Sequence, residues 1–256
     1  MDFQIDKIYN EDCLEGMKRI ADGAVDCIIT DLPYGLTGNS WDSVIPLEPM
    51  WEQFKRVTKP NAAIVLFGSQ PFTSTLVMSN PTWFKHEWIW QKNRGSNFGT
   101  VKFGPMREHE NILVFSKGRV TYNPQMQERA EGGKDRRKYD VQFSSSSTNY
   151  AESLRKNIGR YELSELRQPS SVQFFLTSSG EDHKHPTQKP VDLLRYLILT
   201  YSNEGDTILD ATIGSGTTAV AALMEHRHFI GFETNKEYFD IAQGRIDEIR
   251  RNPTLF

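Results

Sequence analysis

Residues 208–223 read ILDATIGSGTTAVAAL, and this stretch decides the fold class. Its apolar start predicts a short strand, its glycines predict a turn, and the small residues that follow predict a helix. Gly214, Gly216 and Ala219 fit the pattern G-x-G-x-x-[GA]. Glycines let the backbone turn tightly and approach a ligand, and the start of the helix presents free N–H groups. The segment therefore predicts a ligand-binding loop.

An acidic residue follows the loop at an informative distance. Glu233 lies 17 residues beyond Gly216, at the end of the next predicted strand. A carboxylate in this position accepts hydrogen bonds from both hydroxyls of a ribose. The loop and the acid together predict a cofactor that contains adenosine. They leave a nicotinamide dinucleotide, S-adenosylmethionine and a tight turn without a ligand as alternatives.

Strands and helices alternate on both sides of this loop. Strands are predicted at 7–10, 25–30, 62–67, 83–90, 111–115, 207–210 and 229–232, and helices at 14–20, 48–58, 71–78, 190–201, 217–224 and 235–250. Such alternation is typical of an α/β sheet. Only one clear strand follows the loop, so the strands before residue 120 must complete the sheet. The order of the two halves is therefore circularly permuted, with the cofactor half last.

The composition excludes several classes of protein. Of the 256 residues, 38% are hydrophobic and 25% are charged, which excludes a disordered chain. At a net charge of −3, affinity for nucleic acid must come from a local patch. The two cysteines, Cys13 and Cys27, and the histidines lack zinc-site spacing, which predicts a reducing cytoplasm and no metal. No apolar run approaches about 18 residues, so no membrane span is predicted.

Residues 118–180 differ in character from the rest of the chain. They contain Gly132-Gly133 and a serine run at 144–147, and their hydrophobic periodicity is weak. We interpret them as a segment inserted between two halves of one domain, 1–117 and 181–256. The clustered basic side chains in this insert are candidate DNA-binding residues: Arg136, Arg137, Lys138, Arg155, Lys156 and Arg160.

The turn Asp31-Leu32-Pro33-Tyr34 follows the apolar strand VDCIIT. Ligands bind at the carboxyl ends of strands in open α/β sheets. The lone pair of an exocyclic base amine is delocalised into the ring, and two acceptors that hold both amine hydrogens would free it. Asp31 can be one acceptor, and the Leu32 carbonyl, whose direction is restricted by Pro33, can be the other. Tyr34 can stack on the base. The turn is thus a candidate catalytic site.

Three motifs together resemble the DNA amino-methyltransferases that modify adenine N6 or cytosine N4. These motifs are DLPYG, LDATIGSGTT and HPTQKPVDLLRYLI, and their order is that of the β class. Further stretches are similar to the family, including EWIWQK, REHENILVFSKG and FIGFETNKEYFDIAQGRI, so that the resemblance covers nearly all of the chain except about 120–180. It implies a circularly permuted Rossmann-like S-adenosylmethionine methyltransferase sheet with an inserted target-recognition segment.

The resemblance also implies where the cofactor would bind. Glu233 would hold the ribose, and Asp12 would approach the adenine ring. The remaining residues implied at the cofactor are Cys13, Leu14, Thr187, Lys189, Asp210, Gly214, Ser215, Gly216 and Thr217. Two departures from the family pattern stand out: Leu32 replaces the usual Pro, and Ala211-Thr212 replaces the usual Pro-Phe.

The resulting expectation is a site-specific, S-adenosylmethionine-dependent methyltransferase that flips a base out of double-stranded DNA. Adenine N6 is the expected target, because the cytosine N4 members usually have Ser where this chain has Asp31. A cytosine N4 enzyme, a nicotinamide-dependent oxidoreductase and a non-catalytic DNA-binding module are the alternatives. The resemblance implies a cytoplasmic, nucleoid-associated protein of restriction-modification type, and leaves open a homodimer and a cognate restriction endonuclease as partners.

Overall fold

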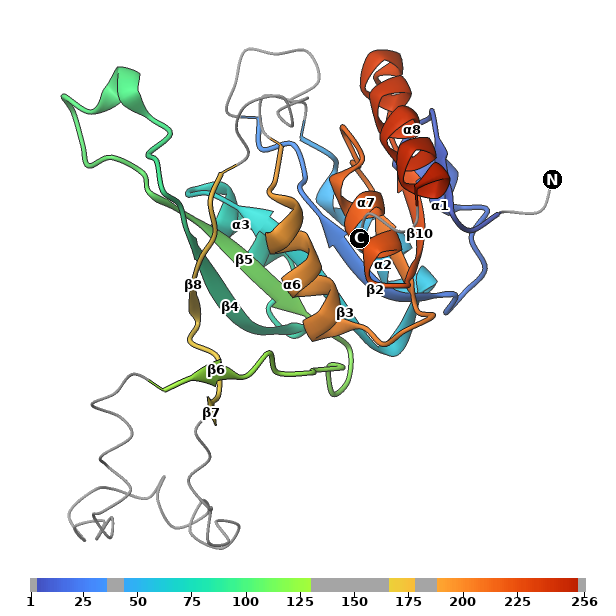
Figure 1. Ribbon diagram of the computed structural model, residues 1–256, viewed down its shortest axis with the longest axis horizontal. Helices are drawn as coiled ribbons and strands as arrows, with labels where there is room; N and C mark the ends of the chain where they lie inside the picture. Colours follow the sequence, from blue (N-terminus) through green and yellow to red (C-terminus); the bar gives the residue numbers. More distant parts are fainter. Residues whose placement is uncertain (1–3, 36–43, 130–165, 178–187, 253–256) are drawn as a thin grey trace, which may run out of the picture. The chain divides into compact units, whose positions relative to one another are not determined.

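The computed structural model describes residues 4–35, 44–129, 166–177 and 188–252 (Figure 1). Its elements in chain order are β1 (Lys7–Tyr9), α1 (Cys13–Met17), β2 (Val25–Thr30), α2 (Leu47–Val57), β3 (Thr58–Gly68), α3 (Phe72–Ser79), β4 (Phe84–Gln91), η1 (Phe98–Thr100), β5 (His109–Phe115), β6 (Gln127–Glu128), β7 (Leu166–Arg167), β8 (Val172–Phe174), α6 (Val191–Tyr201), β9 (Thr207–Asp210), α7 (Thr217–Met224), β10 (His228–Phe232) and α8 (Lys236–Arg251). Each strand and helix predicted from the sequence is present, with bounds shifted by a few residues.

Eight of the described strands form one sheet in the order β1-β10-β9-β2-β3-β5-β4-β8. The strands from β1 to β3 run parallel, whereas β5 runs antiparallel to both β3 and β4. The last two long strands along the chain, β9 and β10, lie between β1 and β2, which come first. This arrangement confirms the permuted α/β fold, because the two ends of the chain complete one sheet.

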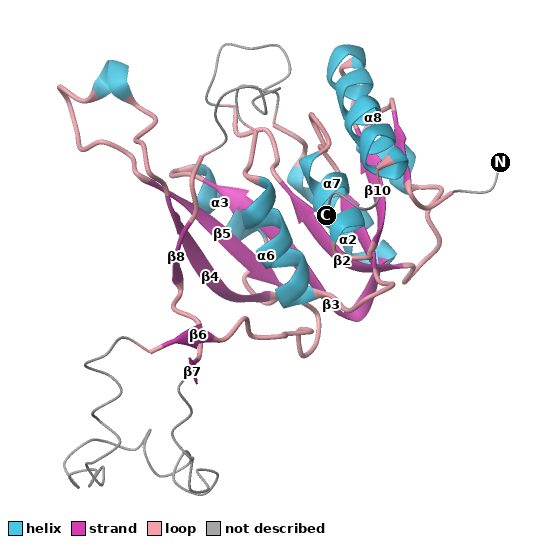
Figure 2. Ribbon diagram, in the orientation of Figure 1, coloured by secondary structure: helices cyan, strands magenta, loops and turns pink. Residues whose placement is uncertain are grey.

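Both faces of the sheet are buried, as the continuous apolar strands require. Side chains alternate along β2, so Cys27 and Ile29 pack in the cluster that contains Leu194 of α6. Ile28 points to the opposite face and packs in the cluster that contains Phe54 of α2. Figure 2 shows α6 and α7 in front of the sheet, with α2 and α3 behind it. The carboxyl edge of the sheet remains free for a site.

The chain divides into two compact units. One comprises Met1–Asn123 and Ser171–Phe256, and it contains the whole eight-stranded sheet, since β8 pairs with β4. The other is Pro124–Ser170, in which β6 and β7 pair antiparallel. The role of 118–180 as a target-recognition insert stays a prediction. Within the described ranges, no helix has the length and apolar character needed to cross a membrane.

Candidate active site

A cavity of about 760 Å³ opens at the carboxyl ends of β2, β9 and β10. Its size is typical of pockets for small molecules. The whole predicted turn lines it, namely Asp31, Leu32, Pro33 and Tyr34, and so does most of the predicted cofactor set, namely Asp12, Cys13, Leu14, Lys189, Asp210, Gly214, Ser215, Thr217 and Glu233. Gly216 of the cofactor set is not among the lining residues. Thr187 and the six basic candidates for DNA binding lie outside the described residues.

The glycine loop between β9 and α7 depends on two glycines in left-handed conformations. Gly214 has φ of 53° and Gly216 has φ of 83°. A Cβ added to Gly214 would meet nothing within 4 Å, so the loop backbone borders open space there. A Cβ on Gly216 would come within 2.8 Å of the Ala242 Cβ, because Gly216 lies against α8. Gly214 thus faces the cavity, and Gly216 allows helix packing.

Glu233 connects the end of β10 to this loop. The Gly214 N–H donates to Glu233 Oε2 at 3.0 Å, and the Asn235 N–H donates to Oε1 at 2.7 Å. Burial raises the pKa of the Glu233 carboxyl, against the backbone donors, which lower it. The two carboxylate oxygens have about four acceptor sites between them, and the backbone N–H groups of Gly214, Thr234 and Asn235 do not use all of them, so the carboxylate can still accept from an incoming hydroxyl.

Asp210 at the end of β9 is fully engaged by its own loop. Thr218 Oγ1 donates to Asp210 Oδ2 at 2.6 Å, and the Thr212 N–H donates to Oδ1 at 3.0 Å. The side chain is buried, and burial raises the pKa of Asp210 to about 6. Asp210 therefore holds the loop and α7 in register while it also borders the cavity.

Asp12, Cys13 and Leu14 form the wall below the loop at the start of α1. Asp12 is the N-cap of this helix, and its Oδ1 accepts from the N–H groups of Leu14 and Glu15 at 2.9 and 3.2 Å. Burial raises the pKa of the Cys13 thiol to about 12. Cys13 is therefore a neutral wall residue and not a nucleophile, because only the thiolate is reactive.

The Asp31 turn is held from two sides. Thr212 Oγ1 donates to the Asp31 carbonyl at 2.9 Å, which connects the glycine loop to the turn. The Tyr34 hydroxyl donates to Asp31 Oδ1 at 2.6 Å, and the Tyr34 ring packs on Phe72 with a centroid distance of 5.1 Å. Thr212, which departs from the family pattern, thus fixes the position of the turn relative to the loop.

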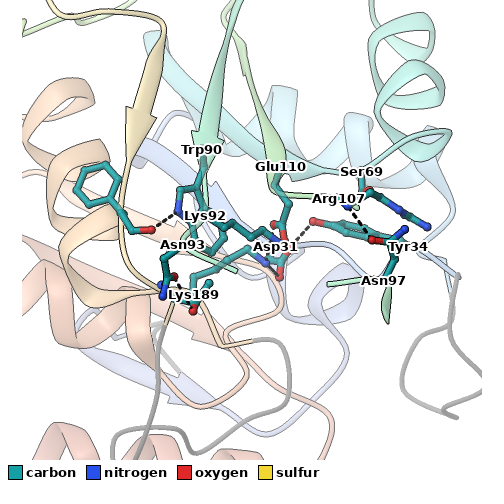
Figure 3. Close-up of polar contacts among 12 residues, drawn as sticks. Asp31, Tyr34, Ser69, Trp90, Lys92, Asn93, Asn97, Arg107, Glu110 and Lys189 are labelled. Atoms are coloured by element: carbon teal, nitrogen blue, oxygen red, sulfur yellow. Dashed lines mark hydrogen bonds and ion pairs between the residues drawn. The ribbon is translucent and has the colours of Figure 1, made fainter. Parts of the chain in front are cut away.

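Four charged side chains form a chain behind the turn (Figure 3). Lys189 Nζ pairs with Asp31 Oδ2 and lies 3.4 Å from Glu110 Oε2, while Lys92 pairs with Glu110 Oε1. Only 9% of the Lys189 side chain and 8% of the Lys92 side chain are exposed. Opposite charges alternate along the chain, which compensates for their removal from water.

The proton affinities of these groups are shifted by burial and by one another. Burial would lower the pKa of Lys189, but Asp31 and Glu110 outweigh it and raise the pKa. Burial would raise the pKa of Glu110, yet Lys189 and Lys92 lower it. For Asp31, burial raises the pKa against the opposing effect of Lys189, and Glu110 adds to the rise. Asp31 is consequently the better proton acceptor of the two carboxylates.

Sequence reasoning assigned no role to Glu110, Lys92 or Thr212. The first two stand in the stretches REHENILVFSKG and EWIWQK, which were recognised only as family-like. They meet because β4 and β5 pair antiparallel, with Trp90 opposite Glu110. The sequence could have indicated these two residues only through their positions, because each lies near the end of a predicted strand, where ligands bind in such sheets. Lys189 was expected only near the cofactor. The structure shows that it also forms an ion pair with Asp31 of the turn.

Comparisons with known proteins agree with this geometry. Residues 25–244 match a DNA methylase family, the N6/N4 methyltransferases. The type II methyltransferase M.HinfI of Haemophilus influenzae is 27% identical over 97% of this chain and 70% of its own. M1.MboII, a type II methyltransferase of Moraxella bovis, is 27% identical over 97% of this chain and 99% of its own.

Solved structures show the same fold. The complex of M1.HpyAVI with SAM has a TM-score of 0.64 at 26% identity, and the match covers 94% of this chain and 98% of that one. The cytosine-N4-specific PvuII DNA methyltransferase has a TM-score of 0.63 at 15% identity, covering 96% of this chain and 91% of that one. At 15% identity, the similarity to the PvuII enzyme shows a shared fold and nothing more.

Proposed function

Since the chain belongs to the DNA methylase family of N6/N4 methyltransferases, we propose that it methylates the N6 amine of adenine in DNA. The coarser activity, S-adenosylmethionine-dependent methylation of a base amine in DNA, follows from membership of the family. One observation carries the proposed transfer of a methyl group to a base amine. The glycine loop with Glu233 and the turn with Asp31 open into the same cavity, so a cofactor and a base amine can meet there.

The residues present fit S-adenosylmethionine. The open space at Gly214 and the remaining acceptor capacity of Glu233 suit a ribose, and Asp12 lines the same cavity. When bound, this cofactor supplies an electrophilic methyl group on a positively charged sulfur. Six carboxylates and four cationic side chains line the cavity, so its lining is acidic on balance, which favours a cationic ligand. A nicotinamide cofactor would leave the turn at Asp31 without a role.

The turn can activate an exocyclic amine by holding its hydrogens. Tyr34 and Lys189 fix the Asp31 carboxylate in place, and Pro33 restricts the direction of the Leu32 carbonyl. Two acceptors in fixed positions would draw the nitrogen toward a tetrahedral form and make its lone pair available to a methyl donor. This is catalysis by positioning and by preorganised charge. Tyr34 also offers a ring for stacking on a base that has left the duplex.

Methylation of the amine releases a proton, and Asp31 is the group placed to receive it. Bound S-adenosylmethionine would supply the methyl group, and the amine nitrogen that accepted it would carry a positive charge until it lost a proton. Burial raises the pKa of Asp31, which makes its carboxylate a better base at neutral pH. Lys189 opposes this rise in the pKa of Asp31, because an adjacent cation favours the charged form of the carboxylate.

Adenine is proposed over cytosine because Asp31 stands where the cytosine N4 members usually have Ser. The test is incubation of the protein with S-adenosylmethionine and DNA from a methylation-deficient host, followed by mass analysis of the nucleosides. We expect N6-methyldeoxyadenosine in the digest. N4-methyldeoxycytidine in its place would overturn the adenine assignment, and no modified base would overturn the activity.

Asp31→Ala is the matched variant for this experiment. It should remove nearly all methyl transfer while S-adenosylmethionine binding stays measurable, since Asp31 lies in the turn and not in the glycine loop. A variant that keeps a tenth of the wild-type rate would contradict the assignment. Sequence-specific recognition by 118–180, a homodimer and a cognate restriction endonuclease stay predictions.

A further inference from the structure

An apolar tip projects from the sheet between β4 and β5. The chain leaves the sheet after Gln91 and returns at His109, and η1 lies within this excursion (Figure 1). We refer to residues 93–108 as the β4–β5 arm. Phe103 is 90% exposed and Phe98 is 65% exposed. Large apolar side chains that are so exposed, and gathered on one projection, mark a surface that binds a partner.

The two sides of the arm are tied together below its tip. The Ser96 N–H donates to the Arg107 carbonyl at 3.1 Å. The Asn97 side chain bridges the two sides, because its Nδ2 donates to the Pro105 carbonyl at 3.1 Å and its Oδ1 accepts from the Arg107 N–H at 2.7 Å. The arm is therefore a built projection that holds its apolar tip away from the core.

The base of the arm forms part of the cavity rim. Arg94, Gly95, Ser96 and Arg107 line the cavity that contains Asp31. Arg107 also reaches across to Ser69 Oγ at 3.3 Å, which anchors the arm to the loop after β3 (Figure 3). A partner that sits on the arm would therefore also lie over the mouth of the catalytic cavity.

The charge of the arm selects the chemistry of this partner. The chain as a whole carries a net charge of −3, yet the arm carries Arg94, Lys102 and Arg107 against the single acid Glu108. Basic side chains attract a phosphate backbone, and exposed aromatic rings stack on unpaired bases or wedge between base pairs. Neither feature alone selects DNA, but their combination at the cavity mouth does.

We propose that the β4–β5 arm binds duplex DNA beside the catalytic cavity, and that Phe98 and Phe103 pack against the bases exposed when the target base leaves the stack. The inference rests on the proposed function and adds a contact surface outside the insert 118–180. Unstacking a base is unfavourable, and an aromatic ring that takes its place offsets part of that cost. The basic side chains of the arm would hold the adjacent phosphates.

The test measures the rate of methyl incorporation into duplex DNA from a methylation-deficient host, at DNA concentrations below saturation. The double variant Phe98→Ala/Phe103→Ala should lose about tenfold or more of this rate, because stacking on a base contributes that much or more. Its S-adenosylmethionine affinity and thermal midpoint should match those of the wild type, because both rings are exposed and lie away from the glycine loop. Met78→Ala is the control, since Met78 is 73% exposed on α3 and should change nothing.

Two single variants separate stacking from simple charge attraction. Phe103→Trp should keep the wild-type rate, because a larger ring still stacks, whereas Phe103→Lys should not. A double alanine variant within about two-fold of the wild type would overturn the proposal. Full activity of Phe103→Lys would overturn the stacking role. If the double variant differed from the wild type in sedimenting mass, the tip would instead be a contact between copies of this chain, which would also overturn the proposal. No incorporation by the wild type would refute the proposed function itself.

Discussion

Lys189 Nζ is ion-paired with Asp31 Oδ2, although the two residues are 158 positions apart in the chain. Lys189 precedes Pro190, the N-cap of α6, and Asp31 stands directly after β2. The Lys189 side chain is nearly buried, with 9% exposed, while 24% of the Asp31 side chain remains open to the cavity. The pair therefore fixes the Asp31 carboxylate from the protein side and leaves part of it open to the cavity.

Lys189→Met should destabilise the fold by about 3 kcal/mol, at the lower end of the range for breaking a buried pair because Asp31 is partly exposed. The loss arises because Asp31 then has no cationic partner and faces the Glu110 carboxylate, which keeps only Lys92. Adding Asp31→Asn to Lys189→Met should restore part of the stability. Urea unfolding of both single variants and the double variant measures this coupling, and strictly additive losses would contradict it.

Glu110→Gln should lower the rate of methyl transfer while leaving S-adenosylmethionine affinity nearly unchanged. Glu110 acts through Lys189, and it also raises the pKa of Asp31. Removing its charge should lower the pKa of Asp31, so the acid limb of the pH–rate profile should move to lower pH. Glu225→Gln is the control, because the Glu225 side chain is buried to a similar degree as that of Glu110 and forms an ion pair with Arg195, away from Asp31. An unshifted acid limb would argue against this positioning role.

Glu233→Ala should weaken S-adenosylmethionine binding by about ten- to a hundred-fold, since a charge-assisted hydrogen bond contributes about 1.5–3 kcal/mol. The structure adds a second expectation. Glu233 also accepts from Gly214 and Asn235, so Glu233→Gln, which keeps one acceptor oxygen, should lose less affinity than the alanine variant. Calorimetric titration measures both. Unchanged affinity in Glu233→Ala would mean that the cofactor binds elsewhere.

Asp210 should make stability depend on pH in the weakly acidic range. Burial raises its pKa from 3.8 to about 6, so between these values the folded state retains a proton that the unfolded state releases. The contribution of Asp210 to stability therefore falls as pH rises from about 4 to about 6, by as much as about 3 kcal/mol, and stays constant above that. In Asp210→Asn this contribution is absent.

The measurement is the free energy of unfolding of wild type and Asp210→Asn from pH 4 to pH 7, without added cofactor. The asparagine side chain can still accept from the Thr212 N–H, which limits the structural change. The difference between the variant and the wild type should grow in favour of the variant as pH rises. A difference that is constant over this range would show that Asp210 ionises at its ordinary pKa.

The basic cluster Arg136, Arg137 and Lys138 lies outside the described residues, and its contact with DNA is predicted from the sequence. Neutralising all three should weaken DNA binding and make the slope of log affinity against log salt shallower by about one to three units, at about 0.9 per phosphate. Cofactor affinity should not change. Equal slopes for the triple variant and the wild type would mean that these side chains do not bind phosphates.

Local patterns in the sequence determined the secondary structure and the order of the two halves. The apolar run of β2, the glycine turn after β9 and the helix spacing of α6 are short-range features, and each predicted its element correctly. The permutation followed from the chain order alone, because a single strand after the glycine loop could not complete a sheet. The residues around the turn at Asp31 and at the glycine loop were likewise found from local motifs.

Tertiary structure alone decided which side chains meet. The pairing of β4 with β5 brings Glu110 beside Lys92, and the crossing of α6 over the sheet brings Lys189 to Asp31. It also separated two glycines that look equivalent in the motif, since Gly214 faces the cavity while Gly216 packs on Ala242. Strand register and helix packing depend on the whole buried core, so such contacts between distant segments have no signature in a local stretch of sequence.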